Sequence, residues 1–383
     1  MQADPNGPFP YELLRRFPDV EAPNLYAWDA TDRLLAERGI AEAAARGLSG
    51  AHIAVIGDAY GAIALRLAAA GLTEVRVHED LATGRVAFAR NAEELGLAGL
   101  QRQGELDAEL LRDVGLVLLQ LPRGLAELEE IADAVARWAA PDVVLVAGGR
   151  VKHMTLAMNG VLGGRFRAVR AELAVQKSRL LIAEGPLPVP ERSPFPVCAT
   201  HDDVGLTLCA HGAAFAGEKL DVGTRFLLGF VERMPVGDAV DLGCGTGALA
   251  AAYALAHPSA KVVATDRSAA ATRSALATMA ANGLGERVVV EHDDAASSRA
   301  DASADVVLLN PPFHLGASVH AGAALRLIEA AARILRPGGE LWTVYNTHLD
   351  YRRHLQAAVG RTSVEGSSRK FRVTRSVRRR SRP

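Results

Sequence analysis

Short apolar runs alternate with longer amphipathic stretches along most of the chain. The runs at 52–56, 239–242 and 305–309 are mainly apolar, which is typical of strands buried on both faces of a sheet. The stretches at 31–46 and 321–335 repeat their apolar residues at the period of an α-helix. Strands that alternate with helices in this way predict an α/β fold built on parallel sheets.

A glycine-rich turn, Asp241-Leu-Gly-Cys-Gly-Thr-Gly247, joins one of these runs to a helical stretch. Its glycines allow a sharp turn and leave no Cβ between the backbone and a ligand. The helix that follows directs unpaired N–H groups and the positive end of its dipole toward the same place. Asp241 can accept a hydrogen bond from a cationic group such as an ammonium. The residues expected to hold a ligand here are Asp241, Gly243, Cys244, Gly245 and Gly247.

Two later strands also end in acids. Val262–Asp266 ends 23 positions after Gly243, where a carboxylate suits the two hydroxyls of a ribose. The apolar run at 288–290 leads into Asp293 and Asp294, and we expect one of them, Asp294 in particular, to reach an adenine amino group. The glycine turn alone also fits a dinucleotide-binding motif. Together these features predict a ligand that carries a nucleoside.

The strand at 305–309 ends abruptly in Asn310-Pro-Pro-Phe-His314. Proline cannot continue a β-ladder, so this segment lies at the carboxyl edge of the sheet, where open α/β sheets bind ligands. The carboxamide oxygen of Asn310 and the carbonyl of Pro311 can each accept an N–H group from one amino nitrogen. Phe313 offers a face on which a base can stack. A turn without chemistry is the alternative interpretation of the tetrapeptide alone.

Taken with the glycine turn and Asp266, this loop resembles the catalytic loop of the class I S-adenosylmethionine-dependent methyltransferases. In that class, Asn-Pro-Pro-Phe accompanies acceptors whose amino nitrogen is conjugated to a ring or a carbonyl. The resemblance implies S-adenosylmethionine as cofactor and no metal. It gives catalytic roles to Asn310, Pro311 and Phe313, and it also places Asn310 against the cofactor.

The first half of the chain contains a weaker copy of these motifs. Gly57, Gly61 and Asp80 each lie 186 positions before a matching residue of the second half, and 118–122 matches 308–312 at an offset of 190. Nearly constant offsets in the same order predict two copies of one domain. The general likeness of all doubly wound domains is the alternative explanation.

The first copy differs where the chemistry is expected. Val55, Ala59, Gln120, Leu121 and Arg123 stand where the second copy has Asp241, Gly245, Asn310, Pro311 and Phe313. We therefore expect two tandem Rossmann-like class I methyltransferase domains, the N-terminal one degenerate. Five prolines within 186–196 indicate a semi-rigid linker. The expected boundaries are 1–185 for the degenerate domain, 186–197 for the linker and 198–383 for the catalytic domain.

Composition sets broad limits on the protein. Its 383 residues are 49% apolar, which supports two cores, and its net charge of −1 provides no overall basic field. Residues 369–383, however, contain eight Lys or Arg and no acid. The start of the chain is polar and no long apolar run occurs, so we expect a cytoplasmic protein with no membrane contact. We also expect a monomer.

The cysteines are few, and their number argues against a disulfide framework. Cys198-x-x-His201 and Cys209-x-His211 raise the possibility of zinc, but their spacing matches no common zinc pattern. A strand from 205 to 215 that places Cys209 on one face is the simpler interpretation.

As a whole, the chain resembles the bacterial ribosomal RNA guanine-N2 methyltransferases, which pair an inactive methyltransferase-like domain with an active one. The segments that carry the likeness are Leu220-Asp-Val-Gly223, 241–247, 310–314, Asn346-Thr-His-Leu-Asp-Tyr351 and Arg369-Lys-Phe-Arg-Val373. Two of them, 348–351 and 369–371, favour the 23S branch of the family over the 16S branch. The resemblance implies that Asn310 and the Pro311 carbonyl hold the guanine N2 amino group while Phe313 stacks on the base.

Several cationic residues are candidates for contact with RNA. The segments 164–170 and 175–179 alternate basic and apolar residues as in a hairpin, whose basic face either binds RNA or is only solvated. The candidate RNA contacts are Arg165, Arg167, Lys177, Arg179, His314, Arg369 and Lys370. The alternative functions are a protein-glutamine or DNA-adenine methyltransferase, or a non-catalytic RNA-binding scaffold; neither enzyme class accounts for an internal duplicate.

Overall fold

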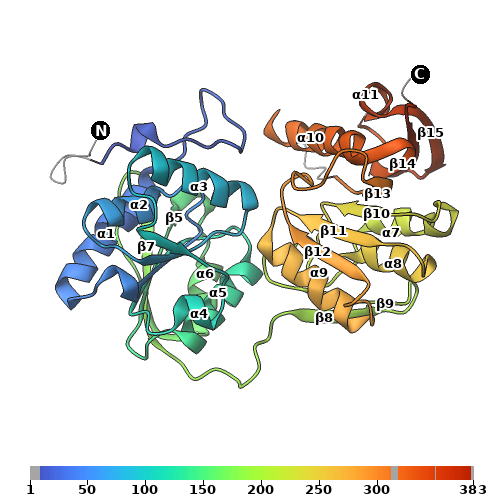
Figure 1. The fold of residues 1–383 in the computed structure, drawn as a ribbon. Helices are drawn as coiled ribbons and strands as arrows, with labels where there is room; N and C mark the ends of the chain where they lie inside the picture. The colour runs from blue at the N-terminus through green and yellow to red at the C-terminus, as the bar shows by residue number, and fades with distance from the viewer. Residues whose placement is uncertain (1–8, 312–317, 350, 381–383) are drawn as a thin grey trace. The chain divides into compact units, whose positions relative to one another are not determined.

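The computed structural model describes residues 9–311, 318–349 and 351–380. The chain divides into two compact units, Met1–Phe195 and Pro196–Pro383 (Figure 1). The boundary between them falls inside the proline-rich segment at 186–197 that was expected to separate two domains.

Unit 1 contains a sheet of seven strands in the order β3-β2-β1-β4-β5-β7-β6. The pairs among β1 to β5 are parallel, whereas β7 pairs antiparallel with both β5 and β6. The elements are α1 (Ala30–Arg46), β1 (Ile53–Ile56), α2 (Ala62–Ala69), β2 (Val75–His78), α3 (Ala82–Glu94), β3 (Gln101–Gln103), α4 (Ala108–Leu111), β4 (Leu116–Gln120), α5 (Leu125–Trp138), β5 (Val144–Arg150), α6 (Leu156–Gly163), β6 (Phe166–Ala171) and β7 (Ser178–Pro186).

Unit 2 repeats this topology, with strand order β12-β11-β10-β13-β14-β16-β15, and adds a small hairpin of β8 and β9. Its elements are β8 (Val197–His201), β9 (Leu206–Ala210), α7 (Val222–Leu228), β10 (Ala239–Leu242), α8 (Ala248–Ala256), β11 (Val262–Asp266), α9 (Ala269–Ala281), β12 (Val288–His292), β13 (Ala304–Leu309), α10 (Ser318–Ile334), β14 (Leu335–Asn346), α11 (Tyr351–Ala358), β15 (Gly360–Ser367) and β16 (Phe371–Arg378). The same order of paired strands in both units confirms the predicted pair of Rossmann-like domains.

The central strands of unit 2 separate two apolar layers. Ala239 of β10 belongs to a cluster with the alanine-rich helices α8 and α9, whereas the next residue, Val240, packs with α10 and α11. This alternation follows from the period of two in a strand, and it requires helices on both faces of the sheet (Figure 1). Because both faces are covered, ligands have access to the sheet at its edges.

The strand expected at 205–215 is shorter in the structure, where it ends at Ala210. Residues 211–220 instead form a loop that includes Ala216 in a left-handed conformation with φ 64°. The helix that follows ends at Leu228, before a separate 3-10 turn at Val231–Arg233.

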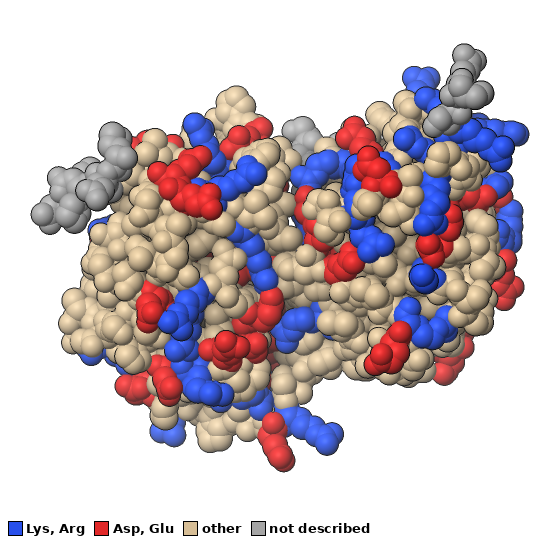
Figure 2. Space-filling model, viewed as in Figure 1, with Lys and Arg blue, Asp and Glu red and all other residues tan. Residues whose placement is uncertain are grey.

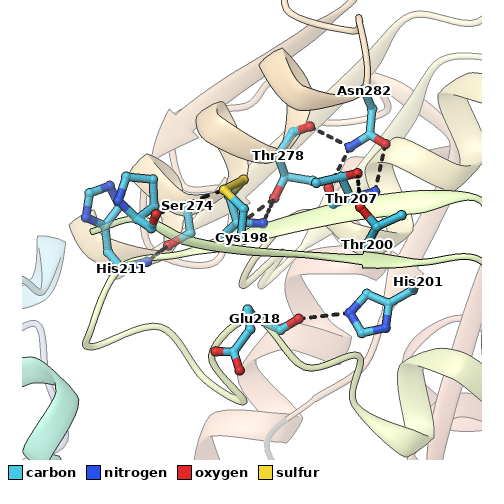
Figure 3. The surroundings of a disulfide bond; sticks show 11 residues. Cys198, Thr200, His201, Thr207, His211, Glu218, Ser274, Thr278 and Asn282 are labelled. Atoms are coloured by element: carbon cyan, nitrogen blue, oxygen red, sulfur yellow. Dashed lines mark hydrogen bonds between the residues drawn. A yellow bond between two sulfur atoms is a disulfide. The ribbon is translucent and has the colours of Figure 1, made fainter. Parts of the chain in front are cut away.

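The argument against disulfides was wrong for one pair, because Cys198 and Cys209 form a disulfide between directly paired positions of β8 and β9 (Figure 3). A zinc site does not form around them. His201 donates from Nε2 to the carbonyl of Glu218, and no cluster of His, Cys, Asp or Glu suited to a metal occurs within the described residues. A hydrogen bond from the backbone N–H of Cys209 to Thr278 Oγ1 (3.0 Å) then fastens the hairpin to α9.

None of the helices in the described part of the chain is long and apolar enough to cross a membrane.

Candidate active site

A cavity of about 490 Å³ opens at the carboxyl ends of β10, β11 and β13 in unit 2. Its volume lies in the range of small-molecule sites. Most of the candidate residues named from the sequence meet here, together with residues of α7, α10 and β16 that sequence reasoning missed. The wall includes Asp221, Thr224, Gly243, Cys244, Gly245, Asp266, Asp293, Asp294, Asn310, Pro311, Arg326, Asn346 and Phe371.

The glycine loop between β10 and α8 has left-handed backbone at three positions, with φ 75° at Gly243, 54° at Gly245 and 80° at Gly247. Gly243 and Gly245 lie on the cavity wall. Gly247 has a different role, because a Cβ there would lie 2.8 Å from Met279 Cε and 3.1 Å from Ala275 Cβ. The structure therefore places Gly247 against α9, where it permits close helix packing, rather than on the wall expected from the sequence.

Asp241 also lies behind the loop instead of on the cavity wall. Its side chain is only 1% exposed, and its Oδ2 accepts a hydrogen bond from the backbone N–H of Ala250 (2.9 Å) in the first turn of α8. Burial raises the pKa of Asp241 to about 7. Its Oδ1 is buried and has no hydrogen-bond partner among the described residues. Asp241 therefore supports the N-terminus of α8 from behind the loop.

Asp266 connects the end of β11 to the glycine loop. Its Oδ2 accepts from the backbone N–H of Gly245 (2.9 Å) and its Oδ1 from that of Ser268 (2.9 Å). Asp266 also lies on the cavity wall, where a ligand can reach it. Asp266 thus combines the predicted ligand-binding position with a structural role in shaping the loop.

The two acids after β12 are already engaged. Asp293 Oδ2 accepts from the backbone N–H (2.9 Å) and the hydroxyl (2.8 Å) of Ser298, which closes the following turn. Asp294 forms an ion pair with Arg326 of α10, and both side chains lie on the cavity wall. A ligand at Asp294 would therefore meet a neutralised carboxylate, which can still accept hydrogen bonds.

Asn310 lies at the end of β13 with its two amide atoms in different surroundings. Nδ2 donates to Asp221 Oδ2 (3.0 Å) and to Thr224 Oγ1 (2.8 Å), whereas Oδ1 is buried without a partner among the described residues. Pro311 is buried beside it on the cavity wall. Phe313 and His314, to which catalytic and RNA-binding roles were assigned, lie outside the described residues.

The basic residues predicted to contact RNA differ in their surroundings. Arg165 is committed to α5, because its Nε lies 3.1 Å from Asp133 Oδ1, and Arg179 is half-buried in β7 with an Nε that lacks a partner among the described residues. Arg165 therefore serves mainly to hold unit 1 together. Arg167 and Lys177 are exposed.

Arg369 and Lys370 are exposed in the turn between β15 and β16, directly before Phe371 on the cavity wall. The carbonyl of Lys370 accepts from the backbone N–H of Thr347 (2.9 Å), which fixes the turn against the carboxyl end of β14. Lys and Arg side chains gather near the C-terminal end of unit 2 (Figure 2). The exposed cations of residues 351–380 are Arg352, Arg353, Arg361, Arg369, Lys370, Arg379 and Arg380. Of these, Arg361, Arg379 and Arg380 lie at the end of the β15–β16 hairpin opposite the turn.

The corresponding loop of unit 1, residues 57–61, also carries a buried carboxylate. Asp58 is 1% exposed, and its Oδ2 accepts from the backbone N–H groups of Ile63 (3.1 Å) and Ala64 (2.7 Å) at the start of α2. Ala64 is the counterpart of Ala250, whose N–H is bound by Asp241 in unit 2. Asp58 therefore makes in unit 1 the contact that Asp241 makes in unit 2, from a neighbouring sequence position that the alignment of motifs had not identified.

Comparisons with known proteins agree with this division. A family model described as a methyltransferase small domain matches residues 205–375, and one described as an RLMG N-terminal domain matches residues 8–186. The chain is 34% identical to the ribosomal RNA large subunit methyltransferase G of Streptomyces coelicolor, over 97% of this chain and 99% of that protein. It is 36% identical to the protein of the same name from Pseudomonas aeruginosa, over 91% of this chain and 92% of that protein.

Among solved structures, the T. thermophilus 16S rRNA N2 methyltransferase RsmC, in complex with AdoMet and guanosine, superposes with a TM-score of 0.69. The match covers 85% of this chain and 88% of that chain at 22% sequence identity, so it supports a common fold.

Proposed function

The chain belongs to the ribosomal RNA large subunit methyltransferase G family, and from this premise we propose that it transfers a methyl group from S-adenosylmethionine to the exocyclic N2 amino group of a guanine in 23S ribosomal RNA. The observation that carries the proposal is the buried Oδ1 of Asn310, which has no hydrogen-bond partner among the described residues and lies beside a glycine loop at the carboxyl edge of the sheet. A hydrogen-bond acceptor placed in this way suits an amino group of the substrate.

The residues around the cavity fit the cofactor. The loop 243–247 allows close approach of the backbone, and Asp266 lies on the cavity wall at the end of β11, where a carboxylate suits the ribose hydroxyls. Asp294, with its charge balanced by Arg326, would accept from the adenine amino group. Asp241 stabilises a cationic ligand through its field from behind the loop. S-adenosylmethionine supplies an electrophilic methyl group on a sulfonium.

The amino nitrogen of guanine is a poor nucleophile because its lone pair is delocalised into the ring. Oδ1 of Asn310 and the carbonyl of Pro311 would each accept one of its N–H groups and so direct the lone pair toward the methyl carbon. The nitrogen would bond to that carbon as the carbon–sulfur bond is lost, and one N–H proton would leave to water. No strong base is required, because the proton becomes acidic only after the nitrogen has gained the methyl group.

The RNA would approach over the β15–β16 turn, where exposed cations are available to phosphates. Phe371 supplies an aromatic wall beside Asn310, and stacking of the base on Phe313 remains part of the proposal. For unit 1 we propose a supporting role in folding or RNA binding, since Ala59 and Gln120 stand where unit 2 has Gly245 and Asn310. We further propose that the protein acts as a monomer in the cytoplasm.

The alternative functions are less well supported. Relatives that cover nearly the whole chain are named as ribosomal RNA methyltransferases, which argues against protein-glutamine and DNA-adenine substrates. A non-catalytic scaffold would not need an open cavity that combines the glycine loop with a carboxamide oxygen lacking a partner in the described part of the chain.

Replacing Asn310 with Ala tests the proposal. Loss of one preorganised acceptor should lower the single-turnover methylation rate of 23S ribosomal RNA by roughly a hundred- to a thousandfold. Gln120→Ala is the matched control, because Gln120 occupies the equivalent place in unit 1 and its Nε2 donates to Asp32. The control should retain the wild-type rate. Rapid methylation of guanine N2 by the Asn310→Ala enzyme would mean that the active site lies elsewhere.

A further inference from the structure

The N-terminus of α7 is tied to the end of β13 by two hydrogen bonds. Asp221 caps the helix, since its Oδ2 accepts from the backbone N–H of Thr224 (2.9 Å). The same Oδ2 and the hydroxyl oxygen of Thr224 both accept from Nδ2 of Asn310, at 3.0 Å and 2.8 Å. One amide nitrogen therefore donates both of its hydrogens to a single turn of helix.

This arrangement determines which way the carboxamide of Asn310 points. An ionised carboxylate only accepts hydrogen bonds, so the NH₂ group of Asn310 must face Asp221. The oxygen is then forced to the opposite side, where it is buried and lacks a partner among the described residues. With the amide turned around, its oxygen would face the carboxylate of Asp221 and its NH₂ group would face the substrate amine.

Gly223, between the two partners of Asn310, keeps the space in front of that oxygen open. A Cβ at Gly223 would lie 3.1 Å from Asp221 Oδ2, 3.2 Å from Phe371 Cε1 and 3.5 Å from Asn310 Oδ1. The absence of a side chain at this position lets the aromatic ring, the carboxylate and the carboxamide converge on one point of the cavity.

We propose that Asp221 and Thr224 are positioning residues that lock the carboxamide of Asn310 with its oxygen toward the amino group to be methylated. The proposal rests on the proposed function, because it assigns the freed oxygen to the guanine N2 amine. Unit 1 has an amide-to-carboxylate contact at the equivalent place, from Gln120 to Asp32 on α1. Such a contact can therefore also act as a purely structural tie, and the test has to separate the two roles.

Three variants provide the separation. Thr224→Val keeps the shape of the side chain but removes the hydroxyl that accepts from Asn310, whereas Thr224→Ser retains a hydroxyl. Asp221→Asn keeps a good helix cap but introduces an amide that can donate, so that Asn310 is free to turn around. Because each variant loses such a bond, the single-turnover rate should fall about tenfold in Thr224→Val and roughly 10- to 100-fold in Asp221→Asn. The affinity for S-adenosylmethionine, measured by calorimetry, should stay within about twofold of wild type.

Thr362→Val is the control for the loss of a buried hydroxyl outside the site, since Thr362 Oγ1 lies 2.9 Å from Ser376 Oγ in the β15–β16 hairpin. It should lower thermal stability without changing the rate. Recovery of the rate in Thr224→Ser but not in Thr224→Val supports the proposal. Wild-type rates in both Thr224→Val and Asp221→Asn, or equal losses in Thr224→Ser and Thr224→Val, would overturn it. A wild-type protein that methylates no guanine N2 would instead refute the proposed function itself.

Discussion

Alanine at Gly245 and alanine at Gly247 should damage the protein in different ways, although only one residue separates them. Both positions have left-handed backbone, so an L side chain costs about 1–2 kcal/mol of strain at either place. At Gly245 the new Cβ would have no heavy atom within 4 Å, and the cost in stability ends there. The added methyl group would stand on the wall of the cavity.

At Gly247 the new Cβ would lie 2.8 Å from Met279 Cε and 3.1 Å from Ala275 Cβ. The methionine tip can move, but Ala275 belongs to the body of α9, so overpacking adds about 1–3 kcal/mol. The total of roughly 2–5 kcal/mol corresponds to a fall in unfolding temperature on the order of 10 °C for a domain of this size.

Calorimetric titration with S-adenosylmethionine and thermal unfolding of both variants measure the two effects. Gly245→Ala should unfold within a few degrees of wild type. It should bind the cofactor about tenfold or more weakly, because the new methyl group stands where the cofactor comes close to the loop backbone. Gly247→Ala should lose mainly stability. Wild-type affinity in Gly245→Ala would refute the assignment of this loop to the cofactor.

Cys198→Ser should lower the stability of unit 2 by about 3 kcal/mol, since the Cys198–Cys209 disulfide closes a loop over a sequence separation of 11. An unfolding temperature that responds to neither the substitution nor a reductant would argue against the disulfide. Burial raises the pKa of Asp58 to about 6. An unfolded Asp releases its proton near pH 4, whereas the folded chain holds the proton of Asp58 to about pH 6. The contribution of Asp58 to the free energy of unfolding therefore falls as pH rises from about 4 to about 6. Asp58→Asn should flatten the pH dependence of the unfolding temperature over this range. Replacing Arg369 and Lys370 with Ala should weaken RNA binding and reduce its salt dependence. The control Lys261→Ala removes an exposed cation at the amino edge of the sheet and should leave RNA binding unchanged. Equal effects of the two changes would mean that RNA responds only to the overall charge of the protein.

The sequence predicted the frame of the site well because local rules govern that part. Apolar runs fixed the strands, and the carboxyl ends of parallel strands meet at one edge, so Gly245, Asp266 and Asn310 had to lie together. Two copies with nearly constant offsets likewise predicted two sheets of the same strand order.

Predictions failed where a side chain's role depends on a partner far away in the sequence. The charge alternation around Arg165 could not reveal that Asp133 binds it from α5. Asp241 and Gly247 belong to the motif, but whether they face the ligand or the packed helices depends on how α8 lies against its neighbours. The role of Asp58 was not predicted, because its carboxylate binds the helix N–H group that the motif comparison would have assigned to position 55, the counterpart of Asp241.

The proposed function is tested most directly by nucleoside mass spectrometry of ribosomal RNA, with 23S and 16S RNA digested separately. The RNA comes from a deletion strain and from strains complemented with either wild type or Asn310→Ala. Deletion should remove one N2-methylguanosine from 23S RNA alone, and the wild-type gene should restore it where Asn310→Ala does not. An unchanged 23S profile, a loss confined to 16S RNA, or full restoration by Asn310→Ala would contradict the proposed activity or its assigned active site.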